Sequence, residues 1–111
     1  MIGIMLLDHM GMIRSTNRHA AALFRASSDR LIGRSIASLM PDIPFSLNSP
    51  GFNAKSIAHL CEGNDWRTMK CIDLHDRKFA LRFGLTRIND GYNPGNSICY
   101  YVKLMRDGGQ A

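Results

Sequence analysis

The stretch KFALRFGLTRI, at Lys78–Ile88, decides how the rest of the chain is interpreted. Its residues alternate with a period of two, because one set is large and apolar while the other is small or polar. The apolar set is Phe79, Leu81, Phe83 and Leu85, and the intervening set is Ala80, Arg82, Gly84 and Thr86. Successive side chains of a β-strand point to opposite faces, so this pattern predicts a strand with one buried face.

Four further segments have the composition of strands. Ile2–Leu7 is apolar throughout, which predicts a strand buried on both faces in the centre of a sheet. Asp8–Gly11 has turn chemistry, and Met12–Ser15 follows it as the returning strand of a hairpin. The other two predicted strands are Trp66–Leu74 and Ser97–Met105. Both alternations of Trp66–Leu74 mix polar and apolar residues, so the pattern leaves its buried face open.

Short helices are expected between the first two strands and the last three. Each starts at a residue whose side chain can cap a helix, and none is long enough to be stable alone. The predicted helices are Arg18–Phe24 after Asn17, a single turn after Ser27 or Ser28 that ends at Gly33, Ile36–Met40 after Ser35, and a segment from Asn53 or Ser56 to about Gly63. This order predicts an α+β fold, a five-stranded antiparallel sheet with short helices on one face.

Composition narrows the class of protein. The chain has 111 residues, enough for one domain with a modest core. Its net charge of +5 comes from basic residues scattered along the sequence, which favours a solvated surface over a nucleic-acid interface. The apolar opening MIGIMLL is too short to span a membrane and lacks the basic start of a signal peptide. Cys61, Cys71 and Cys99 have no disulfide or zinc-site spacing and suit a reducing cytoplasm.

Motifs of known enzyme classes are missing from the sequence. It contains no G-x-S-x-G, H-E-x-x-H or Walker-type phosphate loop, and its four histidines have no partners at metal-ligand spacing. We therefore expect no catalytic residues and no metal site in this chain, and its function is to be sought in binding.

In their order and spacing, these segments resemble a PAS domain over nearly the whole chain. The resemblance rests on GIMLLD at Gly3–Asp8, Gly11 and Asn17 ahead of AAALF, LIGRSIASLMP at Leu31–Pro41, DLHDRKFALRFGLTRIND at Asp73–Asp90 and YYVKLMRD at Tyr100–Asp107. It implies one PAS domain over residues 1–107 and a tail, residues 108–111, that leads to an output domain. It also implies a non-catalytic sensory module of a multidomain bacterial signalling protein.

In PAS domains the helices and the sheet enclose a cup, which holds a ligand in some members and only side chains in others. The resemblance implies a small apolar or acyl-acid ligand in this cup, with Arg67 or Arg82 at the rim to bind a carboxylate. An ordinary core, in a ligand-free dimerisation module, is an equal alternative because the same residues would build it. The expected ligand-binding residues are Phe52, Ile57, Ala58, Leu60, Arg67, Met69, Phe83 and Tyr100.

A haem-based gas sensor is the third interpretation, with His59 as its candidate iron ligand. His59 belongs to the last predicted helix, several residues after the position near Phe52 and Asn53 where haem-binding relatives carry their ligand. We therefore expect no cofactor. A flavin photoreceptor would need a reactive cysteine in a motif that Cys61 does not match.

The sheet face away from the helices is expected to pair two copies of the domain. The sequence places Cys99, Tyr101 and Met105 on this face, and Met5 and Leu7 are expected to join them. An uncovered apolar face usually marks a partner, and in this family the partner is commonly a second copy. The expected partners are thus a second copy, an output domain in the same protein and a small-molecule signal, with neither nucleic acid nor membrane.

Overall fold

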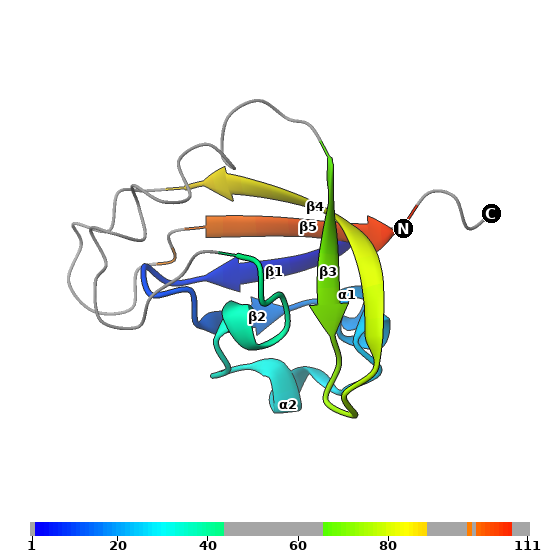
Figure 1. Ribbon diagram of the computed structural model, residues 1–111. Helices are drawn as coiled ribbons and strands as arrows, with labels where there is room; N and C mark the ends of the chain where they lie inside the picture. The colour runs from blue at the N-terminus through cyan, green and yellow to red at the C-terminus, as the bar shows by residue number, and fades with distance from the viewer. Residues whose placement is uncertain (1, 44–65, 89–97, 99, 108–111) are drawn as a thin grey trace.

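The computed structural model describes residues 2–43, 66–88, 98 and 100–107, and their elements form two layers (Figure 1). Five antiparallel strands make one sheet in the order β2-β1-β5-β4-β3, and short helices lie along one face. The strands are β1 (Gly3–Leu7), β2 (Ile13–Thr16), β3 (Arg67–Ile72), β4 (Lys78–Arg87) and β5 (Tyr100–Arg106). The helical elements are α1 (Arg18–Leu23), α2 (Ser28–Leu31) and the 3-10 helix η1 (Ile36–Ser38). The predicted α+β fold class is confirmed.

The helix-covered side of the sheet, here called the inner face, carries the core. In β4 the inward residues are Leu81, Phe83 and Leu85, as the period of two predicted. In β3, Met69 and Cys71 are buried on the same side, and Lys70 points to the other side. The pairing of β3 with β4 therefore settles which face of this segment is buried. Burying each large apolar side chain stabilises the fold by about 1.5–3 kcal/mol.

The prediction for β1 is wrong in two respects. Met5 and Leu7 were expected on the outer face, yet both are fully buried on the inner face, because they pair with Val102 and Tyr100 of β5. The outward residues of β1 are Ile4 and Leu6, which are only half-buried, so the strand is not buried on both faces. β1 lies inside the sheet between β2 and β5, but the middle strand is β5.

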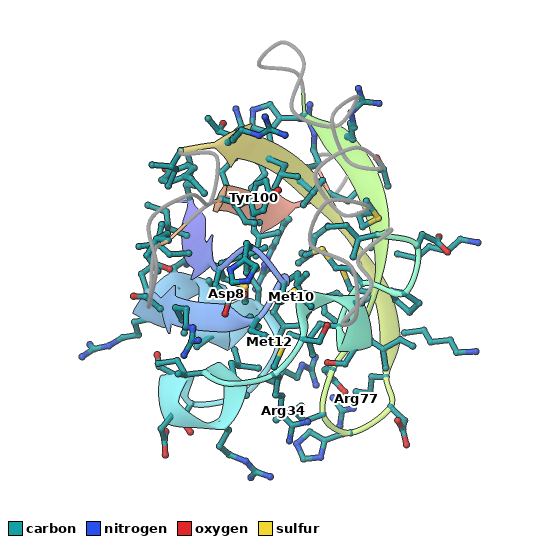
Figure 2. The ribbon with its side chains drawn as sticks, turned by 90° about the vertical axis from the view of Figure 1, so that its left-hand side faces the viewer. Asp8, Met10, Met12, Arg34, Arg77 and Tyr100 are labelled. Carbon is teal, nitrogen blue, oxygen red and sulfur yellow. The ribbon has the colours of Figure 1, made fainter. Side chains whose placement is uncertain are left out.

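An aspartate side chain closes the turn between β1 and β2. Asp8 Oδ1 accepts hydrogen bonds from the backbone amides of Met10 at 2.9 Å and Met12 at 3.0 Å (Figure 2). Its Oδ2 accepts a hydrogen bond from Arg14 Nε at 3.0 Å. Gly11 has a φ of 78°, which glycine adopts without strain. The predicted turn at Asp8–Gly11 is confirmed, and the buried carboxylate has the partners that its burial requires.

The turn between β3 and β4 repeats this arrangement. Asp73 Oδ1 accepts hydrogen bonds from the amides of His75 at 2.8 Å and Arg77 at 3.0 Å. Asp73 is also buried, and Asp76 supplies the left-handed residue with a φ of 60°. Both hairpins are therefore closed by an aspartate at the end of the first strand.

Asn17 joins α1 to β1. Its Oδ1 accepts a hydrogen bond from the Ala20 amide at 2.8 Å, which confirms the predicted N-cap. The same oxygen accepts one from the Ile4 amide at 3.0 Å, and Nδ2 donates to the Ile2 carbonyl at 3.2 Å. The backbone amide of Asn17 donates a hydrogen bond to the Ile4 carbonyl at 2.9 Å. One residue thus starts α1 and holds it on β1.

The remaining helical segments follow the predictions in part. α2 begins after Ser27, and Gly33 follows it with a left-handed φ of 91°, as expected. The predicted helix Ile36–Met40 is shorter, a 3-10 turn at Ile36–Ser38. The helix predicted within residues 53–63 lies outside the described residues, and the division into a domain and a tail stays a prediction. No helix of the described segments is long and apolar enough to cross a membrane.

Two glycines allow close contacts on opposite faces of the sheet. Gly3 lies directly beneath α1, where an added Cβ would be 2.8 Å from Ala20 Cα. Gly84 lies on the outer face under the aliphatic stem of Lys103, whose Nζ is 4.5 Å from the centre of the Trp66 ring. A methyl group would therefore collide with helix backbone at Gly3 and with a flexible side chain at Gly84.

We expect Gly3→Ala to lower the free energy of unfolding by about 1–3 kcal/mol, since α1 must move away from β1 to admit the methyl group. Gly84→Ala is the matched control, because it displaces only Lys103 from Trp66, and it should cost less than about 1 kcal/mol. Urea unfolding followed by circular dichroism measures both. Equal losses in the two variants would contradict the seating of α1 on Gly3.

Candidate ligand-binding site

The predicted ligand-binding residues divide between described and undescribed parts of the chain. Arg67, Met69 and Phe83 lie together on β3 and β4, where Arg67 pairs with Phe83 and Met69 pairs with Leu81. All three share the inner-face register. Tyr100 is described as well, on β5. The other predicted positions lie outside the described residues, namely Phe52, Ile57, Ala58 and Leu60, together with the haem candidate His59.

Tyr100 lies well away from the other predicted residues. Phe83 pairs with Leu104, and Tyr100 is four residues from Leu104 along β5. At the rise of a β-strand, this separation is about 13 Å. Leu85 and Val102, which form a pair, lie between them. The four predicted ligand-binding residues that the structure describes therefore lie along a strip of the inner face.

Side chains fill this strip in the described part of the structure. Phe83, Val102 and Leu104 have no exposed surface, and Leu85 and Tyr100 are each 3% exposed. They belong to one core cluster with residues from the helical layer. Those residues are Phe24, Leu31, Ile36, Leu39 and Met40. An inner face that is packed in this way has the character of an ordinary core.

The two arginines considered for the rim have different positions. Arg67 is exposed at the start of β3, an edge strand of the sheet, on the inner-face register. Arg82 is on the outer face, with its guanidinium carbon 5.9 Å from the centre of the Trp66 ring. The alternative rim position for Arg82 is therefore wrong, because an even-numbered residue of β4 points away from the helices.

A cavity of about 630 Å³ lies beside the β3–β4 hairpin. Pro41 and Asp42 line it from the segment after η1, and Cys71 and Phe79 line it from the strands. The described members of the predicted ligand-binding set, Arg67, Met69, Phe83 and Tyr100, do not line it. Sequence reasoning treated Pro41 only as a helix stop, which is why this cavity was missed.

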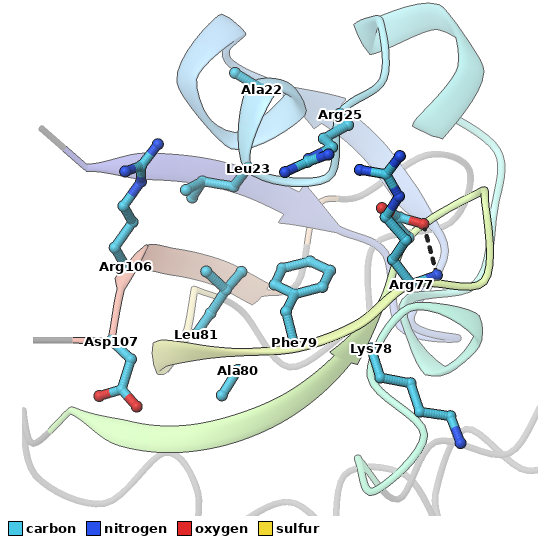
Figure 3. Close-up of a pocket in the computed structure, with 11 residues that line it drawn as sticks. Ala22, Leu23, Arg25, Arg77, Lys78, Phe79, Ala80, Leu81, Arg106 and Asp107 are labelled. Atoms are coloured by element: carbon cyan, nitrogen blue, oxygen red, sulfur yellow. Dashed lines mark hydrogen bonds between the residues drawn. The ribbon is translucent and has the colours of Figure 1, made fainter. Parts of the chain in front are cut away.

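A second cavity, of about 500 Å³, lies at the end of α1 (Figure 3). Its apolar residues include Leu23, Phe79 and Leu81, and basic side chains surround them. One feature of the sequence indicates this cavity, although the hydrophobic pattern does not include it. Arg25 follows the C-cap Phe24, at the position where helices usually carry glycine.

The thiol of Cys71 is shielded on the inner face. The residue is 1% exposed, and burial raises the pKa of the Cys71 thiol from 9.0 to about 12. A thiol with this pKa is protonated at neutral pH and is therefore a poor nucleophile. Within the described ranges, no group of three His, Cys, Asp or Glu side chains is placed to hold a metal ion.

Similar proteins are found by structure and not by sequence. No family model matches the chain, and no curated protein matches it either. The PAS domain of a LuxR-family transcriptional regulator from Burkholderia thailandensis, solved in complex with ethanol, matches with a TM-score of 0.64 and 19% identity, over 94% of this chain and 87% of that one. A domain of a sensor histidine kinase/response regulator from Geobacter sulfurreducens matches with a TM-score of 0.64 and 15% identity, over 96% and 80%.

The PAS domain of nitrogen regulation protein NR(II) from Vibrio parahaemolyticus matches with a TM-score of 0.60 and 16% identity, over 96% of this chain and 89% of that one. These matches span almost the whole chain and agree with its sheet order and helical layer. The fold of this chain is therefore that of a PAS domain, as its sequence segments indicated.

We expect native Cys71 to resist alkylation by iodoacetamide at pH 8, because a pKa of about 12 leaves almost no thiolate. The measurement uses a Cys61→Ser/Cys99→Ser variant, so that Cys71 is the remaining thiol. Unfolding in urea should raise the rate at least about a hundredfold, because the thiol then regains an ordinary pKa and access to solvent.

The same shift predicts a pH dependence of stability. The pKa of Cys71 is higher in the folded state than the ordinary value of 9.0, so its contribution is complete below pH 9 and is lost as the pH rises toward 12. A Cys71→Ala variant, although less stable overall, should lose less stability over this range. A parallel decline in both proteins would contradict the assignment.

Proposed function

We propose that this chain is the sensory module of a multidomain signalling protein. It senses a small apolar or acyl-acid ligand on the inner face of its sheet and passes the change to an attached output domain through the packing of two copies. The domain itself carries no reaction, and its chemistry belongs to the attached domain. The free thiol of Cys71 fits a cytoplasmic location.

The observation that carries this proposal is the position of β5. It is the middle strand of the sheet, and its side chains alternate between two environments. Tyr100, Val102 and Leu104 are buried in the core, while Tyr101 and Met105 are half-buried on the outer face. A signal that displaces the inner side chains therefore also moves the outer ones, because both sets belong to one hydrogen-bonded strand.

The chemistry of the inner face supports a small ligand with an apolar body. Met69, Phe83 and Leu85 contribute only apolar side chains to the inner face. Arg67, at the exposed end of β3, has a planar guanidinium of the kind that binds a carboxylate through two hydrogen bonds. The similar Burkholderia thailandensis domain is a complex with ethanol, which also supports a small-molecule signal. A ligand shifts the domain only by its difference in affinity for two arrangements.

The similar domains also support an attached output. They belong to a transcriptional regulator and to a sensor histidine kinase/response regulator. A domain of this kind needs no catalytic group of its own, since its effect on the output domain is mechanical.

The outer face supports pairing with a second copy. Leu6 of β1 pairs with Tyr101 of β5, and Ile4 pairs with Lys103, which stands between Tyr101 and Met105 on the same strand. Ile4, Leu6, Tyr101 and Met105 are half-buried and largely apolar. We call these four residues the outer patch. Two copies related by a twofold axis can bury this patch against itself, which is the usual geometry of a homodimer.

A ligand-free dimerisation module is the second candidate function. It is favoured by the complete burial of Phe83, Val102 and Leu104, which have the packing of an ordinary core. In this case the outer patch alone would carry the function, and no small molecule would bind to the inner face.

We expect short and medium-chain acids to raise the melting temperature of the purified chain if the inner face binds ligand. A thermal-shift series from acetate to decanoate, with mass spectrometry of a solvent extract of the protein, tests this. Phe83→Leu should weaken the shift by reshaping the inner face, whereas Arg30→Ala on the exposed side of α2 should not. The absence of any shift or extracted ligand would favour the ligand-free module, and a Soret band after haem addition would contradict both.

We expect Leu6→Glu to dissociate the dimer, because it would place a charge in the buried part of the interface. Ile32→Glu is the matched control, since Ile32 is an exposed apolar residue of the helical layer, on the other side of the sheet. Sedimentation equilibrium should show at least a tenfold weaker dimer for Leu6→Glu and no change for Ile32→Glu. A monomeric parent chain, or equal effects of the two variants, would rule out pairing through this face.

A further inference from the structure

We infer that the cavity at the end of α1 binds a small organic anion, a carboxylate with a short apolar body, at a site separate from the inner-face strip. The cavity has a volume of about 500 Å³ and is lined from α1, the β3–β4 turn, β4 and the end of β5. This volume is within the range of about 300–1,000 Å³ that is typical of small-molecule sites. Its lining residues include none of the four predicted ligand-binding residues that the structure describes, which are Arg67, Met69, Phe83 and Tyr100.

The floor of the cavity is apolar and firmly held. Phe79 and Leu81 rise from β4, and Leu23 faces them from α1 (Figure 3). The Phe79 ring packs edge-on against Phe24, with ring centroids 5.4 Å apart and an angle of 66° between the planes. Phe24 has no exposed surface, so it fixes the ring of Phe79 in place. An apolar chain or ring can lie on this floor.

The rim is basic. Arg25, Arg77, Lys78 and Arg106 line the cavity, and the acidic residues that line it are Asp73 and Asp107. Figure 3 shows Arg25 and Arg77 reaching toward the same space from two different elements. Asp73 is buried and its Oδ1 already accepts two backbone hydrogen bonds. The charge balance of the cavity therefore favours an anion.

The arginines of the rim have no carboxylate partner in the described part of the chain. None of Arg25, Arg77 and Arg106 forms an ion pair with another described residue, whereas Arg14 does so with Asp8. Two guanidinium groups that face one space repel each other, and an oxyanion between them would relieve the repulsion. The planar fork of arginine is well suited to a carboxylate, which it binds through two parallel hydrogen bonds.

The backbone of Arg25 supplies an independent argument. Arg25 has a φ of 54°, a left-handed conformation that is strained for a residue with a side chain. Glycine would adopt it freely at this position after a helix. Strained residues persist mainly where their side chains have a role. An arginine kept here at a cost in stability directs its guanidinium over the floor made by Phe79.

Size, floor and charge together select the ligand. A purely apolar molecule would leave the arginines unpaired, and a small inorganic anion would leave the floor uncovered. A carboxylate with an apolar body of a few carbons satisfies both parts of the cavity. We use octanoate as the probe, with acetate and 1-octanol as controls that carry only the charge or only the chain.

The experiment is a titration of the 111-residue chain with octanoate, followed by amide chemical shifts in ¹H–¹⁵N spectra. We expect the shifts to centre on Ala22–Leu23 and on Phe79–Leu81, and we expect octanoate to bind at least about tenfold more tightly than acetate or 1-octanol. Arg25→Gly and Arg77→Gln should each weaken binding about five- to tenfold, and raising the salt concentration should weaken it further. Arg18→Gln, which removes the same charge at the other end of α1, should have no effect.

Arg25→Gly also separates binding from folding. Glycine removes the strain at this position, so the variant should melt a few degrees higher than the parent while it binds octanoate less tightly. Loss of affinity therefore cannot come from loss of structure. The proposal is overturned by equal binding of octanoate and 1-octanol, by full affinity in both arginine variants, or by shifts that centre on Met69 and Phe83. That last result would instead support the proposed inner-face site, so the two proposals fail separately.

Discussion

The hydrogen bonds of Asn17 hold the two layers of this domain together. α1 has six residues, too few to be stable alone, and it keeps its place because Asn17 binds the backbone of Ile4 and Ile2 as well as the first turn of the helix. The close approach at Gly3 then sets the height of α1 above the sheet. In this position of α1, Phe24 at its C-terminal end packs into the core. The position of the cavity at the end of α1 therefore also depends on the side-chain amide of Asn17, although Asn17 lies at the other end of this helix.

The two faces of the sheet differ in composition and in packing. The inner face is apolar and tightly packed, so a change there cannot be absorbed locally and must move neighbouring strands. The outer face combines apolar residues of β1 and β5 with Trp66, whose ring is close to the cations of both Arg82 and Lys103. Because β5 contributes to both faces, a displacement in the core would reach the surface through this strand, as the proposed function requires.

The sequence predicted those features that depend on neighbouring residues. The period of two in Lys78–Ile88 identified β4 and the inward direction of Phe83, and the type of residue at Asn17 identified a helix cap. The prediction for β1 was wrong because a strand that is apolar at every position has no alternation of polar and apolar residues. Only its pairing with β5 assigns Met5 and Leu7 to the core. The α1 cavity was unpredictable for the same reason, since its arginines come together only through the tertiary fold.

The pairing of β1 with β5 also has a consequence for biosynthesis. Gly3 pairs with Leu104, so β1 gains its second neighbour only after β5, the last strand of this sheet, has been synthesised. Until then the chain holds two hairpins that no strand joins, each with an open apolar edge. A transcript cut short before β5 would yield such hairpins, which are natural substrates for chaperones and proteases. The order of strands thus makes β5 the strand that covers the facing edges of β1 and β4, while β2 and β3 remain the edge strands of the finished sheet.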